Sequence, residues 1–127
     1  MKIETISKQV RLDIVKMINK GSSSHIGSAL SCVDLVLSVY KYFLNYDPNY
    51  PTDPDRDIFI LSKGHGALSY YSALLEVGLI SKSVFDSFQV NGSDLTAHPV
   101  MNMELGIESS NGSLGQGLSL AVGLALA

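Results

Sequence analysis

The sequence predicts an α/β fold in which helices flank a parallel sheet. Isoleucine and valine residues recur at helical spacing over residues 3–18, whereas residues 58–61 form a continuous apolar run. Such a run is typical of a strand that is buried on both faces of a parallel sheet. Two glycine-rich loops, residues 62–66 and 111–117, each lead into an apolar segment. With 127 residues, the chain has the size of one domain at most.

Start and stop signals place two helices in the first third of the chain. The first helix covers residues 3–18, and Gly21 with the three serines that follow it would end this helix. Ser31 and Asp34 form the S-x-x-D pattern of a capping box, which indicates the start of the second helix. Apolar residues then continue at a period near 3.6 as far as Phe43.

Helical patterns also follow the apolar run. A helix is expected from about Ala67 to Val77, with Gly78 as its C-terminal cap, and a short helix is expected after Ser81. Residues 89–113 are predicted to be mostly irregular, with a short strand near Ile107.

The predicted sheet is too small to be complete. One convincing strand and one doubtful strand cannot form a parallel sheet that has both faces covered. The apolar run after Gly117 also reaches Ala127 without a helix stop signal. We therefore expect residues 1–127 to be the first part of a larger domain.

Composition limits the classes of partner and compartment. The net charge of −3 and the isoelectric point near 5.4 argue against a nucleic-acid surface. The single Cys32 cannot form an internal disulfide and is expected to be a small core residue. The N-terminus lacks a signal-peptide core, and the apolar segment after Gly117 is shorter than the ~20 residues that cross a bilayer. We expect a soluble cytoplasmic protein.

All three histidines lie beside small residues at predicted element junctions. His25, His65 and His98 each have a glycine, serine or proline nearby. An isolated loop histidine is more often a surface or capping residue, but three in this context favour a functional site. Their wide separation in sequence argues against zinc, because zinc ligands usually include a closely spaced pair.

The two glycine-rich loops favour a cofactor or a phosphorylated ligand. Glycine lets the backbone approach a ligand closely, and the following helix start offers unpaired N–H groups. No Gly-Lys-Ser/Thr follows, and the glycine spacing does not fit a dinucleotide fingerprint. Lys63 is expected to be solvated, residues 53–57 to form a solvated loop, and the tyrosines to serve in packing.

These motifs, in this order, resemble the N-terminal part of transketolases. The resemblance covers nearly the whole chain and rests on residues 55–57, 61–65, 98–99 and 112–117. It is strongest to members that are split into separate N- and C-terminal chains. The family binds thiamine diphosphate between two domains and moves a two-carbon ketol unit between sugar phosphates. Residues 1–127 would then be the N-terminal portion of the diphosphate-binding domain.

The resemblance also implies roles for individual residues. His65 would hydrogen-bond the diphosphate, while His25 and His98 would contact donor-sugar hydroxyls and assist proton transfer. Further contacts with the cofactor would come from one loop, residues Gly112, Ser113 and Leu114. One departure from the family pattern stands beside the first histidine, where Ile26 replaces a proline.

Other functional groups are expected outside residues 1–127. The ligands of Mg²⁺ would follow Ala127, and the glutamate that activates the thiamine ring would come from a C-terminal pyrimidine-binding domain or subunit. Residues 1–127 alone would then be inactive, and a homodimer or heterotetramer is expected. The alternative is a shortened, non-catalytic relative that acts as an interaction or regulatory subunit.

Overall fold

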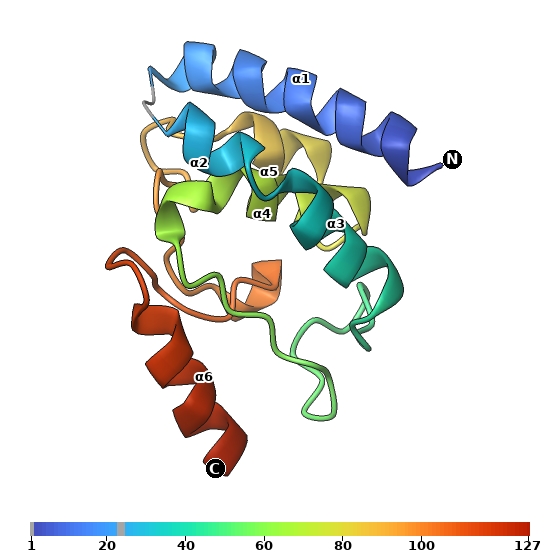
Figure 1. The fold of residues 1–127 in the computed structure, drawn as a ribbon, viewed down its shortest axis with the longest axis vertical. Coiled ribbons are helices and arrows are strands. Elements are labelled where there is room, and N and C mark those ends of the chain that lie inside the picture. The colour runs from blue at the N-terminus through green and yellow to red at the C-terminus, as the bar shows by residue number, and fades with distance from the viewer. Residues whose placement is uncertain (1, 23–24) are drawn as a thin grey trace.

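The structure is a computed structural model that describes residues 2–22 and 25–127. All regular elements of the described residues are helices or 3₁₀ turns, apart from one isolated β-bridge (Figure 1). In chain order they are α1 (Ile3–Gly21), α2 (Ile26–Leu30), α3 (Val33–Tyr42), the 3₁₀ turn η1 (Gly64–Gly66), α4 (Ala67–Glu76), α5 (Lys82–Asp86), the 3₁₀ turn η2 (Met103–Leu105) and α6 (Gln116–Leu126).

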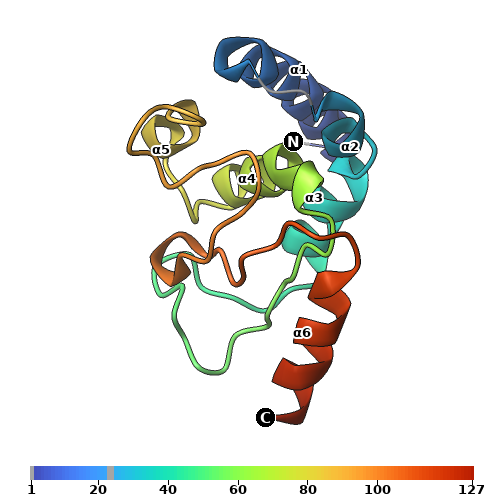
Figure 2. The ribbon, with the colours of Figure 1, turned by 90° about the vertical axis from the view of Figure 1, so that its left-hand side faces the viewer.

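Helices α1 to α5 gather into one cluster, and α6 extends away from it (Figures 1 and 2). Irregular segments between α3 and η1, and between α5 and α6, lie between this cluster and α6. Helix α4 packs against α1, α2 and α3 and forms the centre of the core, because every residue from Ala67 to Leu74 is buried. Tyr70 and Tyr71 are among them, so the predicted packing role of these two tyrosines is confirmed.

Helix α1 confirms the first periodic pattern. Its buried face includes Ile6, Val10, Ile14 and Met17, which the helical repeat of 3.6 residues places on one side. The helix ends at Gly21, as the sequence indicated. Two of the serines expected to end the helix, at positions 23 and 24, lie outside the described residues.

The predicted capping box of the second helix is wrong. The Ser31 hydroxyl donates to the Ser28 carbonyl at 3.0 Å, and α3 begins only at Val33. The Asp34 carboxylate instead pairs with Arg11 on α1, with Nη2 and Oδ2 2.7 Å apart, and accepts a hydrogen bond from Ser7. A contact between two helices has therefore replaced a local cap.

The two predicted strands are not present as strands. Among the described residues the only β-bridge joins Asn102 and Ile107, and residues 58–61 have no strand beside them. A backbone segment needs a neighbour with free N–H and C=O groups to become a strand. The apolar run at 58–61 has no such neighbour among residues 2–22 and 25–127.

The predicted signals for the next two helices are confirmed. Gly78 has a positive φ of 84°, and Leu79 N–H donates to the Leu74 carbonyl at 2.9 Å just after α4. Ser81 caps α5 by accepting a hydrogen bond from Val84 N–H at 3.3 Å.

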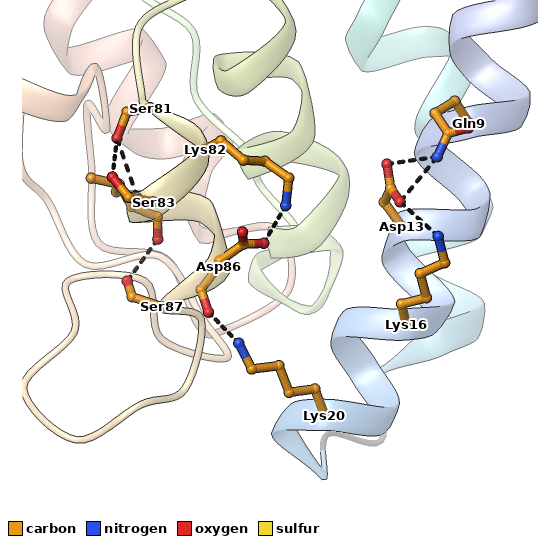
Figure 3. A network of polar contacts seen from close by, with 10 residues as sticks. Gln9, Asp13, Lys16, Lys20, Ser81, Lys82, Ser83, Asp86 and Ser87 are labelled. Atoms are coloured by element: carbon orange, nitrogen blue, oxygen red, sulfur yellow. Dashed lines mark hydrogen bonds and ion pairs between the residues drawn. The ribbon is translucent and has the colours of Figure 1, made fainter.

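Helix α5 is also tied to the end of α1. Lys20 Nζ donates to the Asp86 carbonyl at 2.7 Å, as Figure 3 shows. Within α5, Lys82 pairs with Asp86, one helical turn further along (Figure 3). These contacts are exposed and are expected to add little to stability.

Helix α6 differs from the others because it is apolar but exposed. Its one buried residue is Gly117, while Leu118 and Leu126 are 69% and 84% exposed. In the described part of the chain, no helix is both long and apolar enough to span a membrane.

Candidate functional site

The three histidines, which are far apart in sequence, come together in the fold. His25 immediately precedes α2, His65 lies in η1, and His98 lies in the irregular segment after α5. Their ring centroids are 4.7 Å apart for His25 and His65, 5.1 Å for His25 and His98, and 4.5 Å for His65 and His98. We call His25, His65 and His98 the histidine cluster.

Lys63 fixes the position of η1 against α2. Its ammonium group donates to the Ser28 carbonyl and to the Ser31 hydroxyl, both at 2.8 Å. Behind these contacts, the Ser69 hydroxyl of α4 donates to the Ala29 carbonyl of α2. Lys63 is therefore a bridging residue rather than a solvated lysine, and the sequence-based expectation for it was wrong.

Helix α4 and the glycine-rich loop both hold the segment that carries His98. The Tyr71 hydroxyl donates to the Thr96 carbonyl at 2.9 Å. Asn111 N–H donates to the Pro99 carbonyl at 3.1 Å. His98 is therefore fixed from both sides, and its position depends on the loop that leads to α6.

Gly64 allows the close approach of this loop to the histidines. A Cβ atom added to Gly64 would overlap the Asn111 carbonyl oxygen, lie 2.8 Å from the Asn111 carbonyl carbon, and lie 2.9 Å from His98 Cδ2. Real Cβ atoms do not show such contacts, so glycine is required here. Because Gly64 has no side chain, Asn111 and His98 can pack against η1, the turn that carries His65.

The glycine-rich loop also lies directly against Ser62. Gly115 N–H donates to the Ser62 carbonyl at 3.0 Å, and a Cβ on Gly117 would lie 2.7 Å from Ser62 Cα. The two glycine-rich loops that the sequence singled out are therefore neighbours. The residues expected to contact a cofactor are exposed at this junction, namely Gly112, Ser113 and Leu114.

A buried ion pair anchors the chain just before this loop. Arg56 donates to both carboxylate oxygens of Glu108, from Nε at 2.9 Å and from Nη2 at 2.7 Å. The two side chains are only 10% and 7% exposed. The expectation that residues 53–57 form a simple solvated loop is therefore wrong for Arg56.

The environment of the site favours a neutral imidazole at His98. Burial lowers the pKa of His98 below its usual value, and the nearby His65 and His25 lower it further. The site also contains buried polar atoms without a hydrogen-bond partner in the described part of the chain. These atoms are His65 Nδ1, Ser62 Oγ and Asn111 Oδ1. Such atoms are costly to leave unpaired, so they suit a polar ligand.

The histidine cluster has the arrangement of a set of nitrogen ligands. One ligand atom from each of its members lies within 4.8 Å of the others. Over residues 2–22 and 25–127, this is the only group of three or more histidine, cysteine or acidic residues placed to share a metal ion. The wide sequence separation that argued against zinc is therefore no obstacle in the fold.

The comparison with protein families agrees with these motifs. The sequence pattern of "Transketolase, thiamine diphosphate binding domain" matches residues 3–127. The chain belongs to the transketolase family. The resemblance predicted from the two glycine-rich loops and the histidines is thereby confirmed at the level of the family.

Transketolases and transketolase subunits are similar to this chain over nearly all of its length. One subunit of an apulose-4-phosphate transketolase from Actinobacillus succinogenes is 42% identical over 126 residues, which are 98% of this chain and 46% of that protein. The 6-deoxy-6-sulfo-D-fructose transketolase subunit SqwG of a Clostridium species is 37% identical over 93% of this chain and 43% of that protein. The chain spans about half the length of these relatives.

A solved structure confirms the fold class. The transketolase from Leishmania mexicana superposes with a TM-score of 0.87 at 28% identity, over 99% of this chain and 19% of that one. The chain therefore has an α/β thiamine diphosphate-binding fold, although the described residues are mainly helical. The α/β prediction is confirmed through this likeness.

Proposed function

We propose that this chain supplies part of the thiamine diphosphate site of a transketolase-type enzyme that transfers a two-carbon ketol unit between sugar phosphates. The observation that carries the proposal is the convergence of His25, His65 and His98 beside the loop that starts α6. Membership of the transketolase family supports the same function.

Two features of the site fit a diphosphate group. The Nδ1 atom of His65 is buried and unpaired among the described residues, so it is free to bind a ligand. A Cβ on Gly112 would meet nothing within 4 Å, in contrast to Gly64 and Gly117. The backbone at Gly112 therefore has room beside it for a ligand, and the start of α6 favours negative charge.

The proposal assigns the cofactor contacts residue by residue. His65 hydrogen-bonds the diphosphate, Gly112 and Ser113 contact the cofactor through the loop backbone, and Leu114 packs against it. When bound, thiamine diphosphate supplies the carbanion stabilisation that the transfer needs. The protein residues bind and orient the reacting groups around it.

His25 and His98 are assigned to the donor sugar. Their imidazoles hydrogen-bond its hydroxyl groups, and a neutral imidazole nitrogen can accept a hydroxyl proton and later return it. The lowered pKa of His98 keeps its imidazole neutral near pH 7, which suits the proton-accepting role. Ile26, which follows His25 and is 40% exposed, replaces the proline expected from the family.

The proposal requires further groups from outside these residues. Mg²⁺ prefers oxygen ligands, and the one candidate metal cluster in the described chain consists of imidazoles. We therefore assign the Mg²⁺ ligands to a following segment and the pyrimidine contacts to a C-terminal domain or subunit. The relatives named as subunits support such a partner. A homodimer or heterotetramer in the cytoplasm is part of the proposal.

The test is two-carbon transfer by the assembled enzyme, which contains this chain, the segment with the Mg²⁺ ligands and the pyrimidine-binding partner. Transfer from a ketose phosphate donor should require thiamine diphosphate and Mg²⁺. His25→Ala and His98→Ala should each lower kcat/KM for the donor by about 10²- to 10⁴-fold. Asp13→Asn, a change at a partly exposed position on α1, is the control and should leave kcat/KM unchanged. No transfer in the assembled wild type would favour the non-catalytic alternative.

A further inference from the structure

The histidine cluster has the geometry of a three-nitrogen metal site. Its candidate ligand atoms lie within 4.8 Å of one another and come from three separate segments. Zinc binds imidazole nitrogen at 2.0–2.1 Å in a tetrahedral arrangement, which requires nitrogens about 3.3 Å apart. A fourth coordination position would stay open to water.

The chemistry of the cluster selects a different metal from the one expected for a diphosphate site. Imidazole suits zinc, copper, nickel and cobalt, whereas carboxylate and carbonyl oxygens suit magnesium. The cluster has no carboxylate or thiol member. Edge-to-face packing holds the three rings together, and Lys63, Tyr71 and Asn111 fix the segments that carry them.

One nitrogen of the cluster lacks a hydrogen-bond partner among the described residues. His65 Nδ1 is buried and accepts or donates no hydrogen bond within residues 2–22 and 25–127. A metal ion bound through Nδ1 of His65 would satisfy this unpaired nitrogen.

We propose that His25, His65 and His98 together bind one divalent transition-metal ion, with Zn²⁺ as the representative case, when no cofactor is present. The metal site stands on the geometry of the cluster alone. A second part of the inference rests on the proposed function: because the same imidazoles serve cofactor and donor sugar, Zn²⁺ and thiamine diphosphate exclude one another. Zn²⁺ would then be an inhibitor of cofactor loading.

The test uses purified, untagged protein at pH 7.5, with Zn²⁺ followed by calorimetry and Co²⁺ by visible absorption. In excess Mg²⁺, the wild-type protein should bind one Zn²⁺ ion or, in a separate experiment, one Co²⁺ ion. The Co²⁺ complex should show the intense visible absorption of four-coordinate Co²⁺. His25→Ala, His65→Ala and His98→Ala should each weaken binding by about 10- to 100-fold. His98→Gln, which keeps a similar volume, should weaken binding as much as His98→Ala does. Circular dichroism checks that each variant is folded.

Cys32→Ser is the matched control, because it removes the only thiol from the chain. It should leave the affinity for Zn²⁺ unchanged. The metal site is refuted if wild type binds Zn²⁺ no better than the three alanine variants, or if only Cys32→Ser abolishes binding. In the assembled enzyme, thiamine diphosphate with Mg²⁺ should remove the Co²⁺ absorption. If the absorption persists while the cofactor binds, mutual exclusion is wrong and the metal site stands.

Discussion

Gly64→Ala should separate the segments that form the histidine cluster. The new Cβ would overlap the Asn111 carbonyl oxygen and lie 2.8 Å from the Asn111 carbonyl carbon. The Asn111 atoms belong to the backbone, which cannot rotate away as a flexible side chain can. The added methyl group therefore has to push the glycine-rich loop away from η1, and His98 has to move as well because its Cδ2 atom would lie 2.9 Å away.

The expected cost follows from the nature of this clash. Inserting a methyl group into a packed site usually costs about 1–3 kcal/mol, and contact with backbone atoms places Gly64→Ala near the upper limit. For a chain of this size, a loss of about 3 kcal/mol lowers the melting temperature by on the order of 10 °C. The loss of tertiary contacts should be largest between α4 and the two glycine-rich loops, residues 62–66 and 111–117.

Two other glycines provide graded controls. A Cβ on Gly66 would lie 3.2 Å from Cys32 Sγ and 3.3 Å from Lys63 Cε, so Gly66→Ala should cost less than Gly64→Ala. A Cβ on Gly112 would meet nothing within 4 Å, so Gly112→Ala should change stability by less than about 0.5 kcal/mol. Thermal and urea unfolding, monitored by near-UV and far-UV circular dichroism, measure the order of stability of the three variants. Equal stability of Gly64→Ala and Gly112→Ala would refute the close approach.

Three further predictions concern other contacts of the fold. Gly117→Ala, with its Cβ 2.7 Å from Ser62 Cα, should cost about 1–3 kcal/mol and speed hydrogen exchange at the start of α6; unchanged exchange would contradict the contact. Glu108→Gln should cost about 3–5 kcal/mol in urea unfolding, because it leaves Arg56 charged and buried, and Arg56→Met in the same chain should restore part of the loss. Arg11 and Ser7 lower the pKa of Asp34 from 3.8 to about 2, so this pair stabilises the protein above about pH 4 and loses its effect as the pH falls to 2. Because Asp34 is 68% exposed, Asp34→Asn should remove less than about 1 kcal/mol of this acid dependence, and a larger change would refute the surface location.

Local patterns were sufficient to predict several helices of the fold. The buried face of α1, the glycine that ends α4 and the serine cap of α5 all depend on residues within a few positions of each other. Competition from distant residues explains the failures. Asp34 has the sequence spacing of a cap but pairs with Arg11, 23 positions earlier. The apolar run at 58–61 needs a neighbouring strand, which the described part of the chain does not provide.

At the candidate site too, the residues were predictable from local sequence patterns, whereas the contacts between distant residues were not. The sequence identified the histidines and both glycine-rich loops, because glycine and histidine at element junctions are local signals. It could not show that His25 and His98 approach one another across 73 positions. Nor could it assign Lys63 to bridging α2 and η1, because a lysine beside a glycine has the same pattern when it is solvated.

The central claim, that this chain holds the diphosphate through His65, is tested most directly by the dissociation constant of thiamine diphosphate. In the assembled enzyme with Mg²⁺, calorimetry should show that His65→Ala weakens cofactor binding by about 10- to 150-fold. That range corresponds to the loss of one hydrogen bond to a charged group. His98→Ala should leave the dissociation constant unchanged. If His98→Ala abolishes cofactor binding while His65→Ala has no effect, the assigned roles are wrong.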